Sequence, residues 1–371
     1  MIINKVYHLA DLHIRNLQRH KEYRIVFKKF LKKVKEDKIE DSLIYIAGDI
    51  AHAKTEMSPE LVHEISWFLT ECAKLRETVL ITGNHDCNLN NSHRLDVLTP
   101  IIENLGNDRI HYLRDTGVYN IHNLTFVVYS ILDDKENWPK GDTVDGENTI
   151  CLFHGPVNKA QTDIGYTVSS NSFQVDMFDG FDMAMLGDIH KRQTFGPGYE
   201  HIAYAGSMVQ QNHGEMLENH GYLLWNVPTR TFTEHHIHND YGFLTVDVVD
   251  GKIPQWVYDE VNDKLPKFPR LRLRFTNTEA SQMKLNITEL KKINGGNIAG
   301  SSDTYSVDLA DNVTNKLIFW DEVNDFPFVS VVPGNEVREY HPGGFKWGHL
   351  GINIRAYVYG EEPLDELENV L

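Results

Sequence analysis

The chain has 371 residues, of which 41% are hydrophobic and 24% are charged, as is typical of folded globular proteins. Single hydrophobic cores stop growing at roughly 250 to 300 residues, so we expect one large domain and a smaller one. The net charge of −17 argues against binding nucleic acid through overall charge alone, although bound divalent cations could supply positive charge locally. No apolar run approaches the roughly 20 residues of a membrane helix, and no signal peptide is recognisable, so we expect an intracellular, cytoplasmic protein without a membrane anchor.

The three cysteines indicate a reducing compartment. Cys72, Cys87 and Cys151 show no CxxC spacing, so they suggest no disulfide framework. We expect them to be small buried hydrophobic residues.

The first 240 residues alternate short β-branched runs with amphipathic segments. The first helix is expected within 15–38, where ten basic residues accompany three acidic ones. Its apolar positions recur at helical spacing, so most lysines should lie on the opposite, solvated face; a patch for the DNA backbone is the alternative. These apolar positions are Tyr23, Phe27, Phe30, Leu31 and Val34.

A second helix is expected between the second and third apolar runs, with Ser58 as its N-cap and Pro59 at its first position. Strands alternating with helices predict a layered α/β domain, in which functional sites lie at the carboxyl ends of strands. The expected strands fall within 2–10, 42–48, 77–83, 124–132, 149–155, 182–188, 201–207 and 221–227.

The sequence changes character near residue 240, where we place a boundary between domains 1–240 and 241–371. Glycine and asparagine punctuate the second part, which predicts a smaller α+β domain. Strands are expected at 243–249, 269–277, 326–332 and 352–360, and a helix at 280–293.

Five apolar runs of the first domain end in residues that can bind a divalent cation. A lone aspartate there is usually a turn or cap residue, but five such ends in order suggest one metal site. Carboxylate, imidazole and amide ligands suit Mn²⁺, Fe or Zn²⁺ better than Ca²⁺. Too many ligands for one ion imply two ions, about 3.5 to 4 Å apart. The residues are Asp11, His13, Asp49, His52, Asn84, His85, Asp86, His154, Asp188 and His190.

The ordered motifs DxH, GD, GNHD, H and GxxH resemble the calcineurin-like metallophosphoesterases, and within them the SbcD-type double-strand-break-repair nucleases. The resemblance implies a four-layer α/β/β/α sandwich over 1–240 and a capping domain in 241–371. His52 matches a histidine that these nucleases link to exonuclease action. The segment 204–215, YAGSMVQQNHGE, is similar to the one that leads them into their capping domain.

Carried over by position, the resemblance assigns a role to each motif residue. His85 would support the leaving group or transition state, and Asp86 would orient His85. Asp49 would bridge the two ions. The first ion would be held by Asp11, His13, Asp49 and His190, and the second by Asp49, Asn84, His154 and Asp188.

The sequence departs from the family pattern at two places. Asp188 stands where the nucleases have a histidine; we expect it to remain a ligand of a retuned second ion, and its loss as a ligand is the alternative. The C-terminal segment is short for attachment to the SbcC-type coiled-coil ABC ATPase that the family implies as a partner. The resemblance also implies a homodimer.

The leading hypothesis is a Mn²⁺-dependent DNA nuclease, with exonuclease or endonuclease action on duplex ends and single strands in DNA end processing, repair or recombination. The alternatives are a metallophosphoesterase acting on small phosphodiesters or phosphoproteins, and a non-catalytic scaffold for repair partners.

Overall fold

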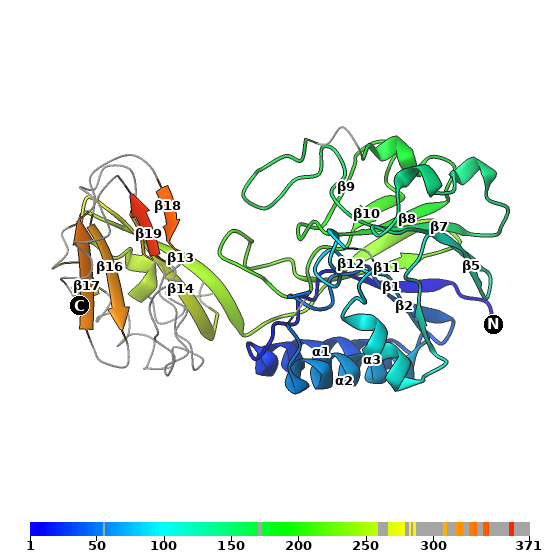
Figure 1. Cartoon of the computed structure of the whole chain (residues 1–371), viewed down its shortest axis with the longest axis horizontal. Coiled ribbons are helices and arrows are strands. Elements are labelled where there is room, and N and C mark those ends of the chain that lie inside the picture. Colours follow the sequence, from blue (N-terminus) through cyan, green and yellow to red (C-terminus); the bar gives the residue numbers. More distant parts are fainter. Residues whose placement is uncertain are drawn as a thin grey trace. The chain divides into compact units, whose positions relative to one another are not determined.

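A computed structural model describes residues 1–54, 56–91, 93–169, 173–258 and 266–278, residues 282 and 285–286, and the backbone of five short strands farther along the chain. The chain divides into two compact units, Met1–Asn239 and Asp240–Leu371 (Figure 1). The helix expected at 280–293 lies mostly outside the described residues.

The first unit contains two six-stranded sheets. In the first sheet, β1, β2, β3 and β4 are parallel and β11 and β12 are antiparallel to their neighbours. Helices follow β1, β2 and β3 in the chain, as parallel connections require. The order is β12 (Thr231–His236), β11 (Gly221–Asn226), β1 (Lys5–Leu9), β2 (Ser42–Ile46), β3 (Thr78–Leu80) and β4 (Ile110–Tyr112), and the helices are α1 (His20–Asp37), α2 (Pro59–Leu75) and α3 (Leu98–Leu105).

The second sheet is also mixed. Its strands β6, β7, β8 and β10 run parallel, and β5 and β9 are antiparallel edge strands. Three short 3₁₀ turns, η1 (Lys135–Asn137), η2 (Gly141–Thr143) and η3 (Val175–Phe178), lie in its connections. The order is β5 (Gly117–Ile121), β6 (Leu124–Tyr129), β7 (Thr149–His154), β8 (Met183–Gly187), β10 (Ile202–Tyr204) and β9 (Gln193–Thr194).

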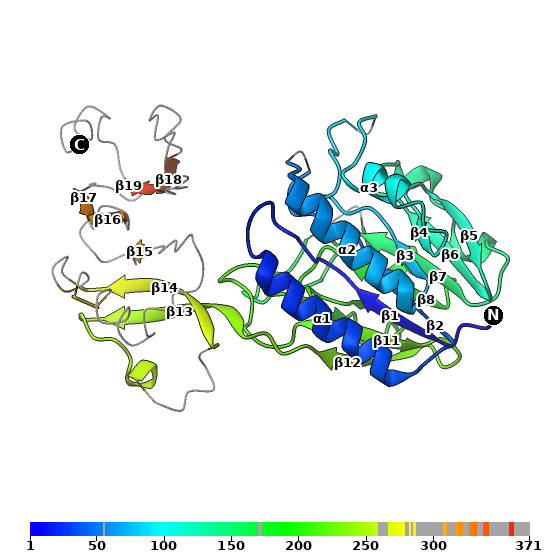
Figure 2. The ribbon, with the colours of Figure 1, turned by 90° about the horizontal axis from the view of Figure 1, so that it is seen from below.

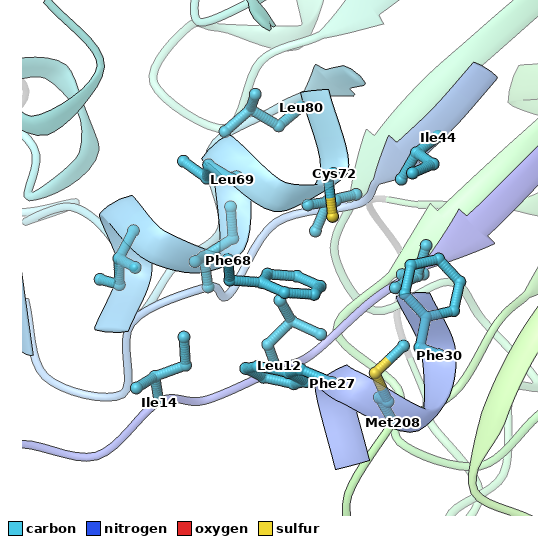
Figure 3. Close-up of a cluster of buried hydrophobic side chains, with 14 of the residues drawn as sticks. Leu12, Ile14, Phe27, Phe30, Ile44, Phe68, Leu69, Cys72, Leu80 and Met208 are labelled. Atoms are coloured by element: carbon cyan, nitrogen blue, oxygen red, sulfur yellow. The ribbon is translucent and has the colours of Figure 1, made fainter. Parts of the chain in front are cut away.

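The helices cover the outer face of the first sheet (Figure 2). Phe27 of α1 stacks on Phe68 of α2, with ring centroids 4.2 Å apart, and both pack among apolar residues of the strands (Figure 3). Ser58 caps α2 by accepting a hydrogen bond from the backbone N–H of Leu61 at 3.2 Å, and Pro59 is its first residue, as expected. The five apolar positions of α1 are buried and Lys28, Lys32, Lys33 and Lys35 are exposed, so the predicted two-faced helix is confirmed.

A second core lies between the two sheets. It is built from inward-facing residues of both, such as Tyr45 and Trp225 of the first sheet and Phe126 and Met185 of the second. A third cluster covers the outer face of the second sheet, where the connecting segments and η3 pack on strand residues such as Phe153. The expected sandwich is confirmed, but the described part of its outermost layer consists of loops and 3₁₀ turns instead of long helices.

Several sequence expectations can be compared with this fold. Cys72, Cys87 and Cys151 are buried free thiols, as expected. The strands β4, β5, β9 and β12 were not predicted, because they are short or polar edge strands. No helix among the described residues is long and apolar enough to span a membrane.

The second unit is described through its strands. It contains a three-stranded parallel sheet and two antiparallel strand pairs. The sheet packs a small apolar core around Val246, Leu273 and Phe275. The sheet strands are β13 (Tyr241–Val249), β14 (Phe268–Thr276) and β15 (Val307–Leu309); the pairs are β16 (Lys316–Asp321) with β17 (Phe326–Val331) and β18 (Val337–Tyr340) with β19 (Ala356–Tyr359), and a 3₁₀ turn, η4, covers Gln255–Tyr258.

Candidate metal centre

The ten candidate residues follow the carboxyl ends of five strands, three from the first sheet and two from the second. Asp11 and His13 follow β1, Asp49 and His52 follow β2, and Asn84, His85 and Asp86 follow β3; His154 ends β7, and Asp188 and His190 follow β8. The contacts described below join residues from both sheets, so the site lies where the two sheets meet.

One group of possible ligands consists of Asp11, His13 and His190, whose ligand atoms all lie within 4.8 Å of one another. The Nε2 atoms of His13 and His190 are 3.0 Å apart. Two imidazole nitrogens can face each other at this distance across one proton or beside one cation. This group coincides with three of the four residues expected at the first ion.

A second group consists of Asp11, Asp49 and His154. The Oδ1 atom of Asp49 lies 3.3 Å from His154 Nε2, and its Oδ2 atom lies 3.4 Å from His13 Nε2. The carboxylate of Asp49 therefore stands between the two histidines, the position that a bridging ligand requires.

Asn84 completes the second group. The end of its amide that faces the site lies 3.1 Å from both carboxylate oxygens of Asp49 and 3.0 Å from His154 Nε2. With the amide oxygen inward, three oxygens and one nitrogen converge, and such an arrangement is stable around a cation. With the amide turned over, its nitrogen donates to Asp49 instead.

The outer nitrogens of two histidines support the fit to a metal. His154 Nδ1 lies 2.7 Å from the carbonyl oxygen of Ala47, and His190 Nδ1 lies 2.8 Å from Glu215 Oε1. Each Nδ1 donates its proton to an oxygen, which leaves the Nε2 lone pair directed into the site, as in metal-binding histidines. The donor set therefore fits divalent cations.

The charges of the site also require compensation. Burial raises the pKa of Asp11 to about 7, although His190 and His154 act to lower it. Burial alone would lower the pKa of His190, but its hydrogen bond to Glu215 and the charge of Asp11 raise it to about 9. Burial likewise opposes ionisation of Asp49, yet His154 holds the pKa of Asp49 well below its usual range. Protons on histidine thus balance the carboxylates, and a bound cation would release them.

The backbone at these strand ends is unusual. Asp11, His13, Asp49 and Asp188 have positive φ angles of 52°, 46°, 50° and 98°. Residues other than glycine rarely adopt such angles. Such conformations collect at functional sites, where surrounding structure holds them in place. Gly83 is needed for a different reason, because a Cβ there would lie 2.1 Å from Asp49 Oδ1.

Asp188 lies at the edge of the second group. Its Oδ1 atom is 3.8 Å from His154 Nε2, and its backbone N–H donates to Asp11 at 3.0 Å. The residue is therefore placed next to both groups, at a longer distance than Asp49. Its role as a ligand, and its alternative role as a lost ligand, remain predictions.

His52 and His85 form a third group with His13. The rings of His52 and His85 stack with centroids 5.3 Å apart, and His85 Nδ1 lies 2.6 Å from the carbonyl oxygen of His52. Burial and the nearby charge of Arg15 lower the pKa of His52 to about 4. His85 is thus oriented by the backbone that also carries His52.

The carboxylate of Asp86 contacts backbone groups of the site loops. Its carboxylate accepts hydrogen bonds from the backbone N–H groups of Ala51 at 2.8 Å and Gly83 at 2.9 Å, and from that of Ile50 at 3.3 Å. Within the described residues the carboxylate bonds these backbone groups and not the His85 side chain, so an orienting effect of Asp86 on His85 would pass through the backbone and stays a prediction. Asp86 ties the end of β2 to the end of β3, and so supports the loops that carry Asp49 and His85.

Glu215 is a site residue that the sequence did not single out. Its side chain is only 7% exposed. Besides His190, it accepts hydrogen bonds from the N–H of Gln211 at 2.8 Å and from Asn212 Nδ2 at 2.8 Å. The only available signal was an acidic residue at the end of the segment 204–215, which gives no hint of a partner 25 residues earlier in the chain.

The sequence that builds this centre matches a known protein family. Residues 4–192, just over half of the chain, match the family described as calcineurin-like phosphoesterase. The chain belongs to the calcineurin-like phosphoesterase family. Calcineurin-like phosphoesterases are phosphoester hydrolases that use divalent metals, and the matched range contains every candidate metal ligand.

Other similarities are more limited. An uncharacterized protein of Acanthamoeba polyphaga mimivirus is 40% identical over 301 residues, which are 78% of this chain and 22% of the viral protein. The chain thus spans about a fifth of that relative. A crystal structure of a Thermus thermophilus protein aligns with 64% of this chain and 100% of its own at 10% identity, with a TM-score of 0.39. Residues 282–371 match the family described as bacteriophage tail tube terminator protein.

Proposed function

We propose that the chain is a metal-dependent DNA nuclease of the SbcD type that uses two divalent ions, with Mn²⁺ as the metal, in DNA end processing, repair or recombination. The observation that carries this proposal is the position of His52, whose ring stacks on that of His85 and lies 5.3 Å from that of His13. A histidine at this place in the motif distinguishes the nucleases to which the sequence is similar.

The residues divide the work of hydrolysis among them. Asp11, His13, Asp49 and His190 would hold one ion, and Asp49, Asn84, His154 and Asp188 the second. When bound, the ions supply Lewis-acid activation of water and stabilise charge on the phosphoryl oxygens.

His85 would act on the substrate itself. Because its Nδ1 is hydrogen bonded to the carbonyl oxygen of His52, its Nε2 would be the nitrogen that faces the substrate and supports the departing oxygen. Asp86 holds the backbone next to this histidine, because its carboxylate accepts hydrogen bonds from the N–H groups of Ala51 and Gly83.

The second candidate is hydrolysis of small phosphodiesters or phosphoproteins at the same centre. It is favoured by the net charge of −17, which opposes the approach of DNA. A non-catalytic scaffold is the weakest candidate, because the full donor set is in place. A capping role for the second unit, an SbcC-type ATPase partner and a homodimer stay predictions, and the match of residues 282–371 to the tail tube terminator family gives the capping role no support.

The test compares nucleotide release from end-labelled duplex and single-stranded DNA with turnover of bis(p-nitrophenyl) phosphate, in Mn²⁺ and in Mg²⁺. We expect Mn²⁺-dependent release from DNA that Asn84→Ala and His85→Ala abolish. Turnover of the small diester without release from DNA would overturn the nuclease in favour of the second candidate. Failure of the chain to bind metal would revive the scaffold.

A further inference from the structure

Two arginines of the segment between β1 and α1 lie beside the candidate metal centre and differ in their contacts. Arg19 is neutralised by Glu22, which accepts from its Nε and an Nη atom at 2.9 Å each. Arg15 forms no ion pair within the described residues, and its buried Nε has no hydrogen-bond partner there. Its Nη2 donates a long hydrogen bond of 3.4 Å to the carbonyl oxygen of Gln211.

The backbone places Arg15 next to the site. Ile14 pairs with Ala51, and the N–H of His52 donates to the carbonyl oxygen of Ile14 at 3.1 Å. Arg15 is also the charged residue that acts most strongly on His52. The guanidinium therefore lies on the side of the site that carries His52.

The nearby groups that could neutralise Arg15 have other partners. Tyr23 lies within hydrogen-bonding reach of the guanidinium, but it offers a hydroxyl and not a carboxylate, and that hydroxyl donates to the carbonyl oxygen of His13 at 2.7 Å. Glu215, the carboxylate that acts on it electrostatically, already accepts from His190, Gln211 and Asn212. Burying a guanidinium without a carboxylate partner costs free energy, unless an anion pairs with it.

We propose that Arg15 forms an anion subsite that binds a second phosphate of the substrate, next to the phosphate held at the metal centre. The guanidinium presents a planar fork of donors that suits phosphate oxygens. Such a subsite would select a nucleotide chain, with a phosphate on either side of each sugar, over an isolated diester. The inference rests on the proposed function and extends it to the substrate.

The subsite can be tested by calorimetric binding of two nucleotides to the metal-loaded full chain. Thymidine 3′,5′-bisphosphate carries a second phosphate that thymidine 5′-monophosphate lacks. We expect the chain to prefer the bisphosphate by about tenfold or more, as a charge-assisted hydrogen bond allows. Arg15→Gln should remove the preference and leave the monophosphate affinity within about threefold, because the monophosphate lacks the phosphate that Arg15 would contact.

Two further variants separate a local contact from general charge. Lys28→Gln removes one positive charge from the exposed face of α1 and should keep the preference. Arg15→Lys retains the positive charge without the planar donors of the guanidinium, so it should keep part of the preference for the bisphosphate. The salt dependence of single-strand binding should also fall in Arg15→Gln by about 0.7 in the logarithmic slope, the value of one lost phosphate contact.

The outcomes distinguish this inference from the proposed function. No binding of the bisphosphate, equal binding of both nucleotides by the unchanged chain, or a preference that survives Arg15→Gln overturns the subsite, even if DNA is cleaved. A preference that requires Arg15, in a chain that does not cleave DNA, supports the subsite and overturns the nuclease.

Discussion

Histidine and carboxylate side chains gather at two places in the first unit, and the two clusters are built differently. Away from the metal centre, Glu77 accepts from His111 Nε2 and from His122 Nε2 at 3.0 Å each, so each carboxylate oxygen has its own donor. At the metal centre, nitrogen faces nitrogen between His13 and His190, and with its amide oxygen inward Asn84 faces the carboxylate oxygens of Asp49.

The difference shows how a binding centre is told from a structural cluster with the same composition. The Glu77 cluster is complete without a further group, and it joins β4 of the first sheet to the β5–β6 turn of the second. The metal centre is complete only with added positive charge. Unfavourable facing of like atoms is therefore a better sign of a ligand site than residue type.

The comparison would break if a carboxylate of the metal centre proved dispensable. Asp49→Asn should lower turnover of a phosphodiester by roughly three orders of magnitude, because it removes the charge expected between the two ions. Calorimetric titration with Mn²⁺ should show a matching loss of affinity. Glu77→Gln is the control and should keep both; full turnover by Asp49→Asn would contradict the assignment.

Asp86 tests whether a buried carboxylate near the centre can be purely structural. Asp86→Asn should destabilise the fold by about 2 to 3 kcal/mol, because the new amide nitrogen would face a backbone N–H of Ala51 or Gly83. Urea unfolding measures the change. Asp145→Asn, the same substitution at an exposed carboxylate, is the control and should cost less; an equal or larger cost there would contradict the structural role of Asp86.

Glu215 sharpens the comparison, because it belongs to the centre without facing a cation. Glu215→Gln should weaken Mn²⁺ binding by about 10- to 100-fold, since an amide orients His190 less well. Equilibrium dialysis and elemental analysis measure this independently of turnover. Glu218 is exposed, so Glu218→Gln is the matched control. Unchanged affinity in Glu215→Gln would remove the orienting role.

The smallest effect is expected at the structural cluster. Glu77→Gln should cost about 1 kcal/mol of stability at neutral pH, the upper range for partly exposed ion pairs. Burial opposes ionisation of Glu77, but hydrogen bonds from His111 and His122 lower its pKa. A carboxyl group whose pKa is lowered by folding stabilises the fold at pH values above the ordinary pKa of glutamate. This stabilisation is lost as the pH falls. The difference between variant and unchanged chain should therefore shrink below about pH 4, as urea unfolding at several pH values would measure.

The sequence was informative where periodicity or order along the chain carries the signal. Tyr23, Phe27 and Val34 recur at helical spacing and are buried on α1. The polar ends of β1, β2, β3, β7 and β8 were recognised in order because parallel strands bring their carboxyl ends together.

Other features depend on contacts that no spacing reveals. Two of the partners of Asp86 are the backbone N–H groups of Ile50 and Ala51, about 35 residues away, and backbone N–H groups carry no sequence signal. Glu215 meets His190 only because a long loop returns to the site. β12 was missed because most of its side chains are exposed and none is buried, while its backbone pairs with β11.

The two sheets contribute different halves of the candidate ligand set, Asp11, His13, Asp49 and Asn84 from the first and His154, Asp188 and His190 from the second. Global unfolding separates these halves, so cations that bind the native chain also act as a reversible clamp between the sheets. By mass action, free metal at about 100 times its dissociation constant adds about 2.7 kcal/mol to the free energy of unfolding. Metal supply would then set the stability of the folded chain as well as its chemistry.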